Sequence, residues 1–390
     1  MIKTMIEADR LVLFLSGKID SSNAAEFAAQ IRSALSDHPD LPWLMDAGDL
    51  EYISSAGLRV LLRLKQETGN GMTIRNVSSQ IYDTLSMTGF TEIMNVQRQL
   101  RCISVEGCPV IGQGAIGTVY RLDADTIVKV FELSTCLPDI EKEQKKARQA
   151  LVRGIPTAIA YDIVRVGDKY GAVYEMLKAD NCNDLIVRDP ARLDEIIAIY
   201  AALLKKMHSV EMQPGEFPDA REVYCGYLDA LNGILPDDIL DRVRAMILKM
   251  PPELHVIHGD IQMKNVMLSD REPMIIDMET LCVGNPVFDF AGLWMAYCAF
   301  DEDDPGNSMA FLGFNEETSL YIYQKVVSLY FSDDPALQQK QDRILVLGVI
   351  RFLYIVLVMG LDKQELKEIR LRRNRERLEA LLERVDALAL

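Results

Sequence analysis

The sequence predicts two folded parts: a small α/β domain with a mixed sheet, followed by an α+β bilobal domain whose C-terminal lobe is largely helical. Two observations predict this. Residues 1–97 alternate short apolar strands with amphipathic helices, and an H-G-D-x-x-x-x-N loop at 258–265 leads from long helical segments into a hairpin. The 390 residues suffice for two or three domains, and 49% of them are apolar, which is enough for real cores.

The composition excludes several classes of protein. A formal charge of −16 argues against binding of the whole molecule to nucleic acid or to an anionic membrane. The seven cysteines are scattered and form no CxxC pair, which favours reduced thiols in a cytoplasmic protein. Four charged side chains lie in the first ten residues, so no signal peptide is expected. The apolar run 344–361 contains Arg351 near its middle, which predicts a buried core helix because a charge in hydrocarbon is costly.

The first domain, residues 1–97, is expected to hold three buried strands, at Leu11–Leu15, Trp43–Met45 and Met72–Arg75. A helix running to about Leu35 follows an N-cap at residues 21–23. A further helix follows the segment Y-I-S-S-A-G-L, in which strand-like residues give way to small ones.

The L-x-G-x-I-D of Leu15–Asp20 and the Y-I-S-S-A-G-L of Tyr52–Leu58 resemble the STAS domain of anti-sigma-factor antagonists. In that family a serine at the N-terminal tip of a helix is phosphorylated by a partner kinase, and alignment on the Gly-Leu pair places this phosphoacceptor at Ser55. Backbone N–H groups at a helix start stabilise a phosphate, and its charge would change a docking surface. Ser54 stands where the family often has Asp. The alternative is therefore that both serines only cap the helix.

Residues 98–108 are expected to link the domains, and residues 109–177 to form a nucleotide-binding lobe. This lobe opens with a G-x-G-x-x-G motif that has apolar strand residues on both sides, which indicates a hairpin. The dinucleotide-binding form is excluded because it needs a helix at the third glycine. A hairpin tip without side chains can lie over phosphates. The residues expected to contact the nucleotide there are Gly112, Gly114, Gly117 and Val119.

Lys129 lies in the middle of the next apolar strand, where a charge is costly unless it has an anion. Nucleotide phosphates and a helix glutamate are the natural anions. Glu143 is the preferred partner, and Glu141 is the alternative. The segment that crosses between the lobes is expected to hold an adenine edge through backbone groups of Glu175 and Leu177, a placement that rests on order alone.

Residues 178–390 are predicted as the helical lobe, with a charged helix at 363–390. One loop in this lobe carries three candidate site residues, His258, Asp260 and Asn265. A β-hairpin with a polar turn at 269–272 is expected after this loop, and it ends at a fourth candidate, Asp277. In such a site one carboxylate takes the proton of a hydroxyl, while an amide and a second carboxylate hold Mg²⁺ against nucleotide phosphates. His208 is expected to be a packed structural histidine.

These motifs, together with the G-x-P-x-x-D-x-A-like segment Gly284–Ala291, resemble the aminoglycoside phosphotransferase and choline-kinase branch of the protein-kinase-like fold. The resemblance covers about residues 108–330. It implies that Asp260 positions and deprotonates the acceptor hydroxyl, and that Lys129 holds the α- and β-phosphates. It also implies that Mg²⁺ binds Asn265 and Asp277, and that the loop is supported by His258 and Asp289.

The leading hypothesis is an ATP- or GTP-dependent, Mg²⁺-requiring phosphotransferase with a regulatory STAS domain that can bind a protein partner. Its acceptor is expected to be small and hydroxylated, and the acidic chain would suit a cationic one. One alternative is a signalling kinase that phosphorylates a protein serine, including its own Ser55. The other is an anti-sigma-factor antagonist module whose kinase-like half only senses nucleotide. No nucleic acid or membrane is expected as a partner.

Overall fold

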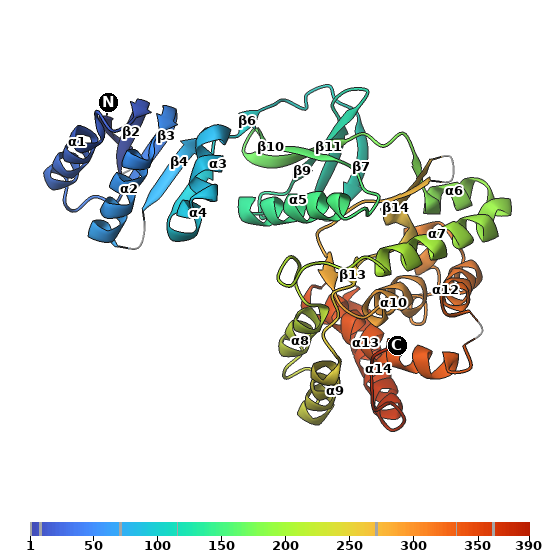
Figure 1. The fold of residues 1–390 in the computed structure, drawn as a ribbon. Coiled ribbons are helices and arrows are strands. Elements are labelled where there is room, and N and C mark those ends of the chain that lie inside the picture. The colour runs from blue at the N-terminus through green and yellow to red at the C-terminus, as the bar shows by residue number, and fades with distance from the viewer. Residues whose placement is uncertain are drawn as a thin grey trace. The chain divides into compact units, whose positions relative to one another are not determined.

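The computed structural model describes residues 2–7, 10–69, 72–114, 116–269, 272–332, 334–360 and 363–390. The chain forms two compact units, one of Met1–Ser104 with Val164–Gly167 and the other of Val105–Ile163 with Asp168–Leu390. The predicted fold class is confirmed, because a mixed α/β sheet comes first and a bilobal α+β unit with a helical C-terminal region follows (Figure 1).

The first unit is built on a five-stranded sheet in the order β1-β2-β3-β4-β5. β1 runs antiparallel to β2, and the other pairs are parallel, so the sheet is mixed as predicted. Leu11, Leu13 and Leu15 are at most 2% exposed, because alternate residues of a strand face the same side of the sheet. The strands are β1 (Ile2–Glu7), β2 (Arg10–Ile19), β3 (Trp43–Ile53), β4 (Thr73–Val77) and β5 (Asn95–Arg98).

Four helices accompany this sheet: α1 (Ala24–Asp37), α2 (Ser55–Thr68), α3 (Ser79–Met87) and α4 (Phe90–Ile93). α2 begins at a real N-cap, since the Ser54 side chain accepts from the backbone N–H groups of Ala56 and Gly57. Asn23 occupies the N-cap position of α1 but does not cap it. Its side chain accepts from Asp20 N and donates to Lys18 O instead, so it fixes the preceding turn.

The N-terminal lobe of the second unit is a sheet packed with one long helix, α5 (Leu137–Val152). The strands of this sheet lie in the order β10-β11-β9-β8-β7, and the short β6 pairs parallel with the end of β10 at Val164 and Arg165, within the part of the chain that belongs to the first unit. β7 and β8 pair antiparallel, so the glycine-rich motif forms a hairpin as predicted. The strands are β6 (Arg101–Cys102), β7 (Val110–Gly114), β8 (Gly117–Arg121), β9 (Thr126–Phe131), β10 (Ala160–Val166) and β11 (Lys169–Glu175).

The remaining chain is mostly helical, and short strands flank the loop at residues 258–265, the candidate catalytic loop. The helices are α6 (Cys182–Arg188), α7 (Leu193–His208), α8 (Ala220–Ala230), α9 (Asp237–Lys249), α10 (Val287–Trp294), α11 (Asn307–Leu312), α12 (Glu316–Phe331), α13 (Leu337–Leu353) and α14 (Lys367–Leu382). The strands are β12 (Asp180–Asn181), β13 (Val256–Ile257), β14 (Val266–Ser269), β15 (Glu272–Ile275) and β16 (Cys282–Val283). Short 3₁₀ turns lie at Pro190–Arg192, Met263–Asn265 and Gln364–Leu366.

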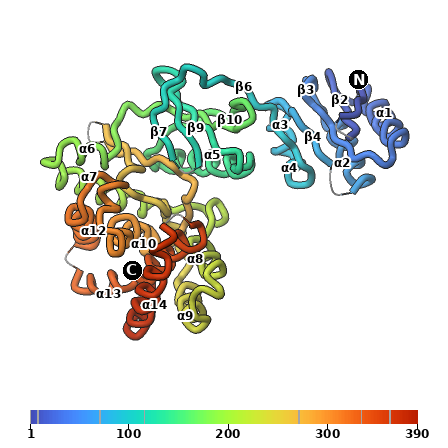
Figure 2. The backbone as a smooth tube through the Cα atoms, turned by 180° about the vertical axis from the view of Figure 1, so that it is seen from behind, coloured from blue at the N-terminus to red at the C-terminus, as the bar shows by residue number. Residues whose placement is uncertain are grey.

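One extensive core fills this lobe, with α10 against α13 and α7 against α12 (Figure 2). The apolar run from residue 344 lies in α13 and continues as a π-helical turn, Tyr354–Val358, so it forms a core helix as predicted. Leu361 and residues 270–271 of the expected turn lie outside the described residues. No helix in the described part of the chain is long and apolar enough to cross a membrane.

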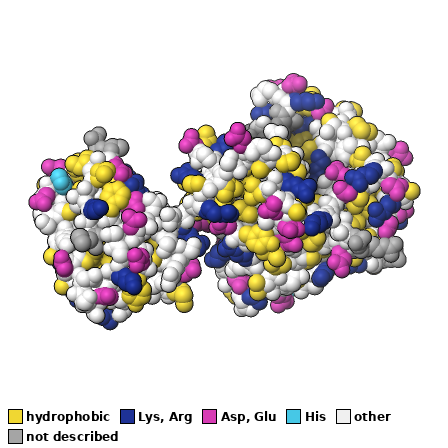
Figure 3. Space-filling view, turned by 90° about the horizontal axis from the view of Figure 1, so that it is seen from above, with side chains coloured by type: hydrophobic (Ala, Val, Ile, Leu, Met, Phe, Trp, Pro, Cys, Tyr) yellow, Lys and Arg dark blue, Asp and Glu magenta, His cyan; other side chains and the backbone are white. Residues whose placement is uncertain are grey.

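The predicted charged helix at 363–390 is shorter than expected, since α14 covers only Lys367–Leu382. Arginines on its inner side pair with acids that follow α10: Arg373 contacts Asp303, and Arg377 contacts Glu302. Elsewhere, acidic and basic side chains are interspersed over the visible face of each unit (Figure 3). The charge of −16 is therefore not gathered into one patch on that face.

Candidate active site

The loop that follows β13 is held by a buried carboxylate from the first turn of α10. Asp289 is 1% exposed, and it accepts from the backbone N–H of His258 at 3.0 Å and of Gly259 at 2.6 Å. Burial alone would raise the pKa of Asp289. The hydrogen bond and charge of His208, the charge of His258 and the hydrogen bond from the Gly259 N–H together outweigh burial, so the pKa is lowered. The loop backbone is thus fixed from the helical core.

His208, at the end of α7, completes this support. Its Nε2 lies 3.0 Å from Asp289 Oδ2, and its Nδ1 lies 2.8 Å from the Tyr330 hydroxyl. The sequence predicted a packed structural histidine, and the structure adds that its partner is the carboxylate that holds the loop. Two further hydroxyls, which the sequence analysis missed, also bind the loop: Tyr200 donates to the Ile261 carbonyl, and Tyr297 accepts from Met263 N.

A glycine is required between His258 and Asp260. Gly259 has φ +82°, and a Cβ there would lie 2.7 Å from the Thr280 carbonyl oxygen. The His258 ring lies against the same backbone, with its Nδ1 accepting from Asp260 N at 3.2 Å and its Nε2 donating to Ile276 O at 3.1 Å. His258 therefore connects the loop to the strand end that carries Asp277.

Asp260 and Asn265 face one another across this loop. The Asn265 amide nitrogen donates to the Asp260 carbonyl at 2.8 Å and to Asp260 Oδ2 at 3.1 Å. Because its NH₂ group is used in this way, the amide oxygen of Asn265 is left as an acceptor or a metal ligand. The Asp260 side chain is 35% exposed and so remains accessible to a substrate hydroxyl.

Asp277 follows β15 in a left-handed backbone conformation with φ 65°. Non-glycine residues seldom adopt this conformation, and such residues cluster at functional sites. Its Oδ1 lies 3.4 Å from Lys129 Nζ, and its side chain is 40% exposed. With the Asn265 oxygen it offers the hard oxygen ligands that Mg²⁺ takes from a protein when substrate phosphates supply others. No cluster of three or more His, Cys, Asp or Glu residues suited to a metal occurs among the described residues, so these two fit a shared metal–phosphate site only.

Lys129, on β9, joins this carboxylate to α5. Its Nζ lies 3.1 Å from Glu143 Oε1, and Glu143 also accepts from the Tyr174 hydroxyl at 3.2 Å. Burial alone would lower the pKa of Lys129, but the Asp277 and Glu143 carboxylates outweigh burial and raise it, so the lysine stays charged. Of the two glutamates left open by the sequence, Glu143 is the one that the structure places against Lys129.

The glycine-rich hairpin pairs closely with the strand that carries Lys129. Gly117 cannot be replaced without movement, because a Cβ there would lie 2.4 Å from the Val130 carbonyl oxygen. Gly112 pairs with Val119, and Gly114 pairs with Gly117 at the tip. Residue 115 of the tip lies outside the described residues.

In the segment between the lobes, some backbone N–H groups already form hydrogen bonds within the protein. Glu175 N donates to Ile159 O at 2.9 Å, and Met176 N donates to Asp125 O at 2.8 Å. In the described part of the chain no backbone carbonyl accepts from Leu177 N. Of the two predicted adenine contacts, Leu177 therefore keeps a free backbone donor, whereas the Glu175 N–H is occupied.

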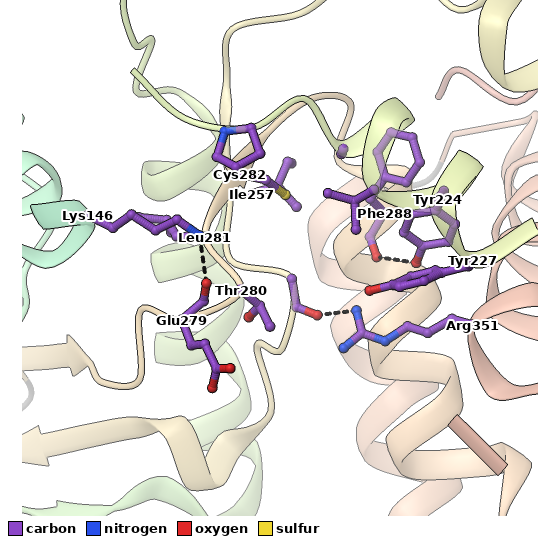
Figure 4. A pocket seen from close by; sticks show the side chains of 14 residues that line it. Lys146, Tyr224, Tyr227, Ile257, Glu279, Thr280, Leu281, Cys282, Phe288 and Arg351 are labelled. Atoms are coloured by element: carbon purple, nitrogen blue, oxygen red, sulfur yellow. Dashed lines mark hydrogen bonds between the residues drawn. The ribbon is translucent and has the colours of Figure 1, made fainter. Parts of the chain in front are cut away.

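Arg351 is the main residue that the sequence analysis did not assign to the site. Its Nη1 donates to the Gly259 carbonyl, and its Nη2 lies 3.7 Å from Asp260 Oδ1 (Figure 4). The signal in the sequence was a lone arginine within an apolar helix, which served there only to exclude a membrane span. A buried charge needs a partner, and here the partner is the catalytic loop.

In the first unit, the two serines at the start of α2 differ. Ser54 accepts from Ala56 N at 3.2 Å and from Gly57 N at 3.4 Å, whereas Ser55 is exposed at the first helical position. Gly57 packs close to the sheet, since a Cβ there would lie 2.7 Å from the Ile19 side chain. The cap function therefore falls to Ser54.

A glycine-rich hairpin over a buried Lys–Glu pair, with an HxDxxxxN loop below it, defines a protein of the kinase-like phosphotransferase class. Comparison of sequences gives the family. The chain belongs to the phosphotransferase enzyme family, whose sequence profile matches residues 107–317, and it carries an N-terminal STAS domain that matches over residues 2–97.

Individual relatives match each part. BtrV of Bordetella bronchiseptica (strain ATCC BAA-588 / NCTC 13252 / RB50), named as a candidate anti-sigma factor antagonist, is 32% identical over 90 residues, which are 22% of this chain and 76% of that protein. The ADP-bound aminoglycoside phosphotransferase APH(2'')-Ib is 17% identical with a TM-score of 0.47, over 78% of this chain and 98% of its own. The amicoumacin kinase hAmiN, in complex with AMP-PNP, Ca²⁺ and Ami, is 13% identical with a TM-score of 0.47, over 79% of this chain and 95% of its own.

Proposed function

We propose that this chain transfers the γ-phosphoryl group of ATP or GTP to the hydroxyl of a small acceptor, and that the STAS domain regulates this reaction. The observation that carries the proposal is the placement of Asp260, Asn265, Asp277 and the Lys129–Glu143 pair around one site. The scattered cysteines are all free, which supports a cytoplasmic location as part of the proposal.

In this proposal the acceptor oxygen attacks the γ-phosphorus, a new O–P bond forms, and the bond from the γ-phosphorus to the β-phosphate oxygen breaks. The hydroxyl proton passes to Asp260, whose carboxylate is oriented by the Asn265 amide. Lys129 holds the α- and β-phosphates, and the free Leu177 N–H is available to the adenine edge. Mg²⁺, when held by Asn265 and Asp277, would neutralise charge on the phosphates.

The test compares Asp260→Asn with Asp386→Asn, an exposed carboxylate near the C-terminus, in Mg²⁺-dependent turnover of ATP and GTP by the full chain. Asp260→Asn is expected to lose about 100-fold or more in turnover, because it removes the proton acceptor. Nucleotide binding, measured by thermal shift, should persist in both variants. Equal turnover by the wild type and Asp260→Asn would show that the site is wrongly assigned.

A second candidate acceptor is Ser55, favoured by one observation: Ser54 makes the cap, and this leaves Ser55 exposed at a helix start. Incubation with γ-labelled ATP should then label the wild type and the exposed-serine control Ser86→Ala, but not Ser55→Ala or Asp260→Asn. Nucleotide binding without turnover or label would favour the third function, a nucleotide-sensing module whose STAS domain binds a protein partner, as the name of BtrV suggests.

A further inference from the structure

A cavity of about 190 Å³ lies beside the catalytic loop, and both lobes of the second unit line it (Figure 4). This volume is below the range of about 300–1,000 Å³ that is usual for ligand pockets, so the cavity suits a small molecule or chemical group. The polar side chains around it come from α5, α8, α13 and the segment after Asp277. The residues that matter for its chemistry are Lys146, Tyr224, Tyr227, Gly259, Glu279 and Arg351.

Arg351 forms the charged wall of this cavity. It is only 6% exposed, and among the described residues its buried Nε has no hydrogen-bond partner. Its guanidinium donates to the Gly259 carbonyl and is hydrogen-bonded to the Tyr224 side chain, and its ion pair with Asp260 Oδ1 is a loose one of 3.7 Å. Arg351 nevertheless lines the cavity, so a ligand there meets a guanidinium whose only close acid among the described residues is Asp260.

Lys146 adds a second positive charge. It lies on α5, one turn after Glu143, and its Nζ donates to the backbone carbonyl of Glu279 at 2.6 Å. The carboxylate of Glu279 lies on the other side of the cavity from Arg351 (Figure 4). Among the described residues, the ion pair of Arg351 is the one with Asp260, so the part of the cavity next to Arg351 holds a positive guanidinium facing a single carboxylate.

The cavity wall on the side of Arg351 is aromatic, because Tyr224 and Tyr227 lie next to the guanidinium (Figure 4). The Tyr227 ring stacks on Tyr354 with centroids 4.2 Å apart, and Tyr224 packs on Phe288 at 4.8 Å. Tyr354 opens the π-helical turn that directly follows α13, and such turns often occur at functional sites. The guanidinium is thus held in place before any ligand arrives, which reduces the entropy lost on binding.

We propose, on the basis of the phosphotransfer proposed above, that the acceptor is a small hydroxylated anion whose carboxylate or phosphate group binds Arg351. A planar guanidinium matches both groups with paired hydrogen bonds. An anion on Arg351 and a hydroxyl on Asp260 lie no more than about 9 Å apart, from the 3.7 Å ion pair and two ordinary hydrogen bonds. This proposal differs from the expectation of a cationic acceptor, which was drawn from the net charge alone.

The test uses four probes that share a hydroxylated three-carbon skeleton: glycerate, glycerol phosphate, uncharged glycerol and cationic 3-amino-1,2-propanediol. Each is given to the full chain with Mg²⁺-ATP, and kcat/KM is measured together with the thermal shift of the nucleotide-loaded protein. The kcat/KM for one of the two anions should exceed that for glycerol and for the amine by about 10- to 100-fold, which is the size of effect expected of hydrogen bonds to a charged group. Which anion leads distinguishes a carboxylate from a phosphate ligand.

Arg351→Met and Arg351→Lys should lower turnover with every probe, because Arg351 touches the catalytic loop, and should also abolish or reduce the preference for the anion. If Arg351 had a purely structural role, turnover with all four probes would fall in the same proportion and the preference for the anion would not change. That result would overturn the proposal. Lys146→Gln is a second test, which does not depend on whether the Arg351 variants fold. Lys146 forms no ion pair within 4 Å among the described residues, and its replacement should reduce the preference for the anion several-fold. Arg372→Gln, an exposed arginine on α14, is the matched control and should keep the wild-type preference.

Failure of this inference is distinguishable from failure of the phosphotransfer itself. Mg²⁺-dependent nucleotide binding and Asp260-dependent ATP hydrolysis to water test the reaction without any acceptor. If these persist and the amine or glycerol binds or reacts as well as the anions, the anionic acceptor is wrong and the phosphotransfer stands. If these are absent, the phosphotransfer is wrong, and the thermal shift that each probe causes in the nucleotide-free protein then tests the anionic ligand by itself.

Discussion

Replacement of Asp289 by Asn tests the account of how the catalytic loop is held. Asp289 is 1% exposed and accepts three N–H groups: the backbone N–H of His258, the backbone N–H of Gly259, and the ring of His208. Asparagine has nearly the same shape but carries one acceptor oxygen and one donor nitrogen. Whichever way the amide is turned, at least one of the three donors faces another donor.

The magnitude follows from these contacts. A hydrogen bond to a charged group is worth about 1.5–3 kcal/mol, and a buried donor left unsatisfied costs about 1–3 kcal/mol. Because these contributions overlap, we expect Asp289→Asn to lower the free energy of unfolding of the second unit by about 3–5 kcal/mol. Asp238 is the matched control, since it also lies in the first turn of a helix but is exposed, and Asp238→Asn should cost about 0.5 kcal/mol or less.

The assay is urea unfolding followed by the fluorescence of Trp294, a buried residue of α10, in a Trp43→Phe background that removes the only other tryptophan. Turnover of Mg²⁺-ATP by the folded variant should fall as well, because the loop that carries Asp260 loses its support. Equal midpoints for Asp289→Asn and Asp238→Asn would refute the conclusion that this carboxylate holds the loop.

The same carboxylate predicts a pH dependence. Its pKa is lowered from the ordinary value of 3.8, so its contribution to stability is fully present above that value and is lost as the pH falls through the lower folded-state pKa. The difference in unfolding free energy between the wild type and Asp289→Asn should therefore be constant from neutral pH to about pH 5 and shrink below about pH 4. A difference that grows on acidification would contradict the direction of this pKa shift.

Three further substitutions separate packing, charge and capping. Lys129→Met should reduce turnover by about 100-fold or more while leaving Glu143 buried without its cation, and unchanged turnover would remove Lys129 from the site. Gly259→Ala should destabilise the protein by more than Gly154→Ala, measured by urea unfolding, because both have positive φ but only Gly259 would place a Cβ against a backbone oxygen. Ser54→Ala should cost the first unit about 1 kcal/mol and Ser55→Ala about 0.5 kcal/mol or less, and the reverse order would show that the cap is wrongly assigned.

The sequence predicted best those features that depend on local spacing. The glycine-rich hairpin and the three strands of the first sheet are present, and the apolar run from residue 344 forms a core helix, although this helix begins earlier, at Leu337. Errors fell at element ends, where small energies decide: Asn23 turns its side chain back to the preceding turn, and α14 ends at Leu382. The acids and amide of the site are also near in sequence or on consecutive elements, so their assembly could be expected from order.

What the sequence could not predict are contacts across long separations. Arg351 is 92 residues from Gly259, and Tyr297 is 34 residues from Met263, yet both bind the catalytic loop. No periodicity records such a contact, because an arginine or tyrosine inside an apolar helix has the same pattern whether it binds another helix or an active site. For Arg351, the packing of α13 against α10 decides whether the side chain meets another helix or the loop at 258–265.

The charge of the acceptor illustrates the same limit. The net charge of −16 is a sum over 390 residues, and acidic and basic groups are interspersed over the visible surface (Figure 3). At physiological salt, exposed charges more than about 8 Å away are largely screened, whereas a buried group within a few ångströms acts almost unscreened. The field at the cavity is therefore set by the nearby charges of Arg351, Lys146, Asp260 and Glu279 rather than by the total. For this reason the preference among the four probes should follow the residue at position 351, whatever the charge of the rest of the chain.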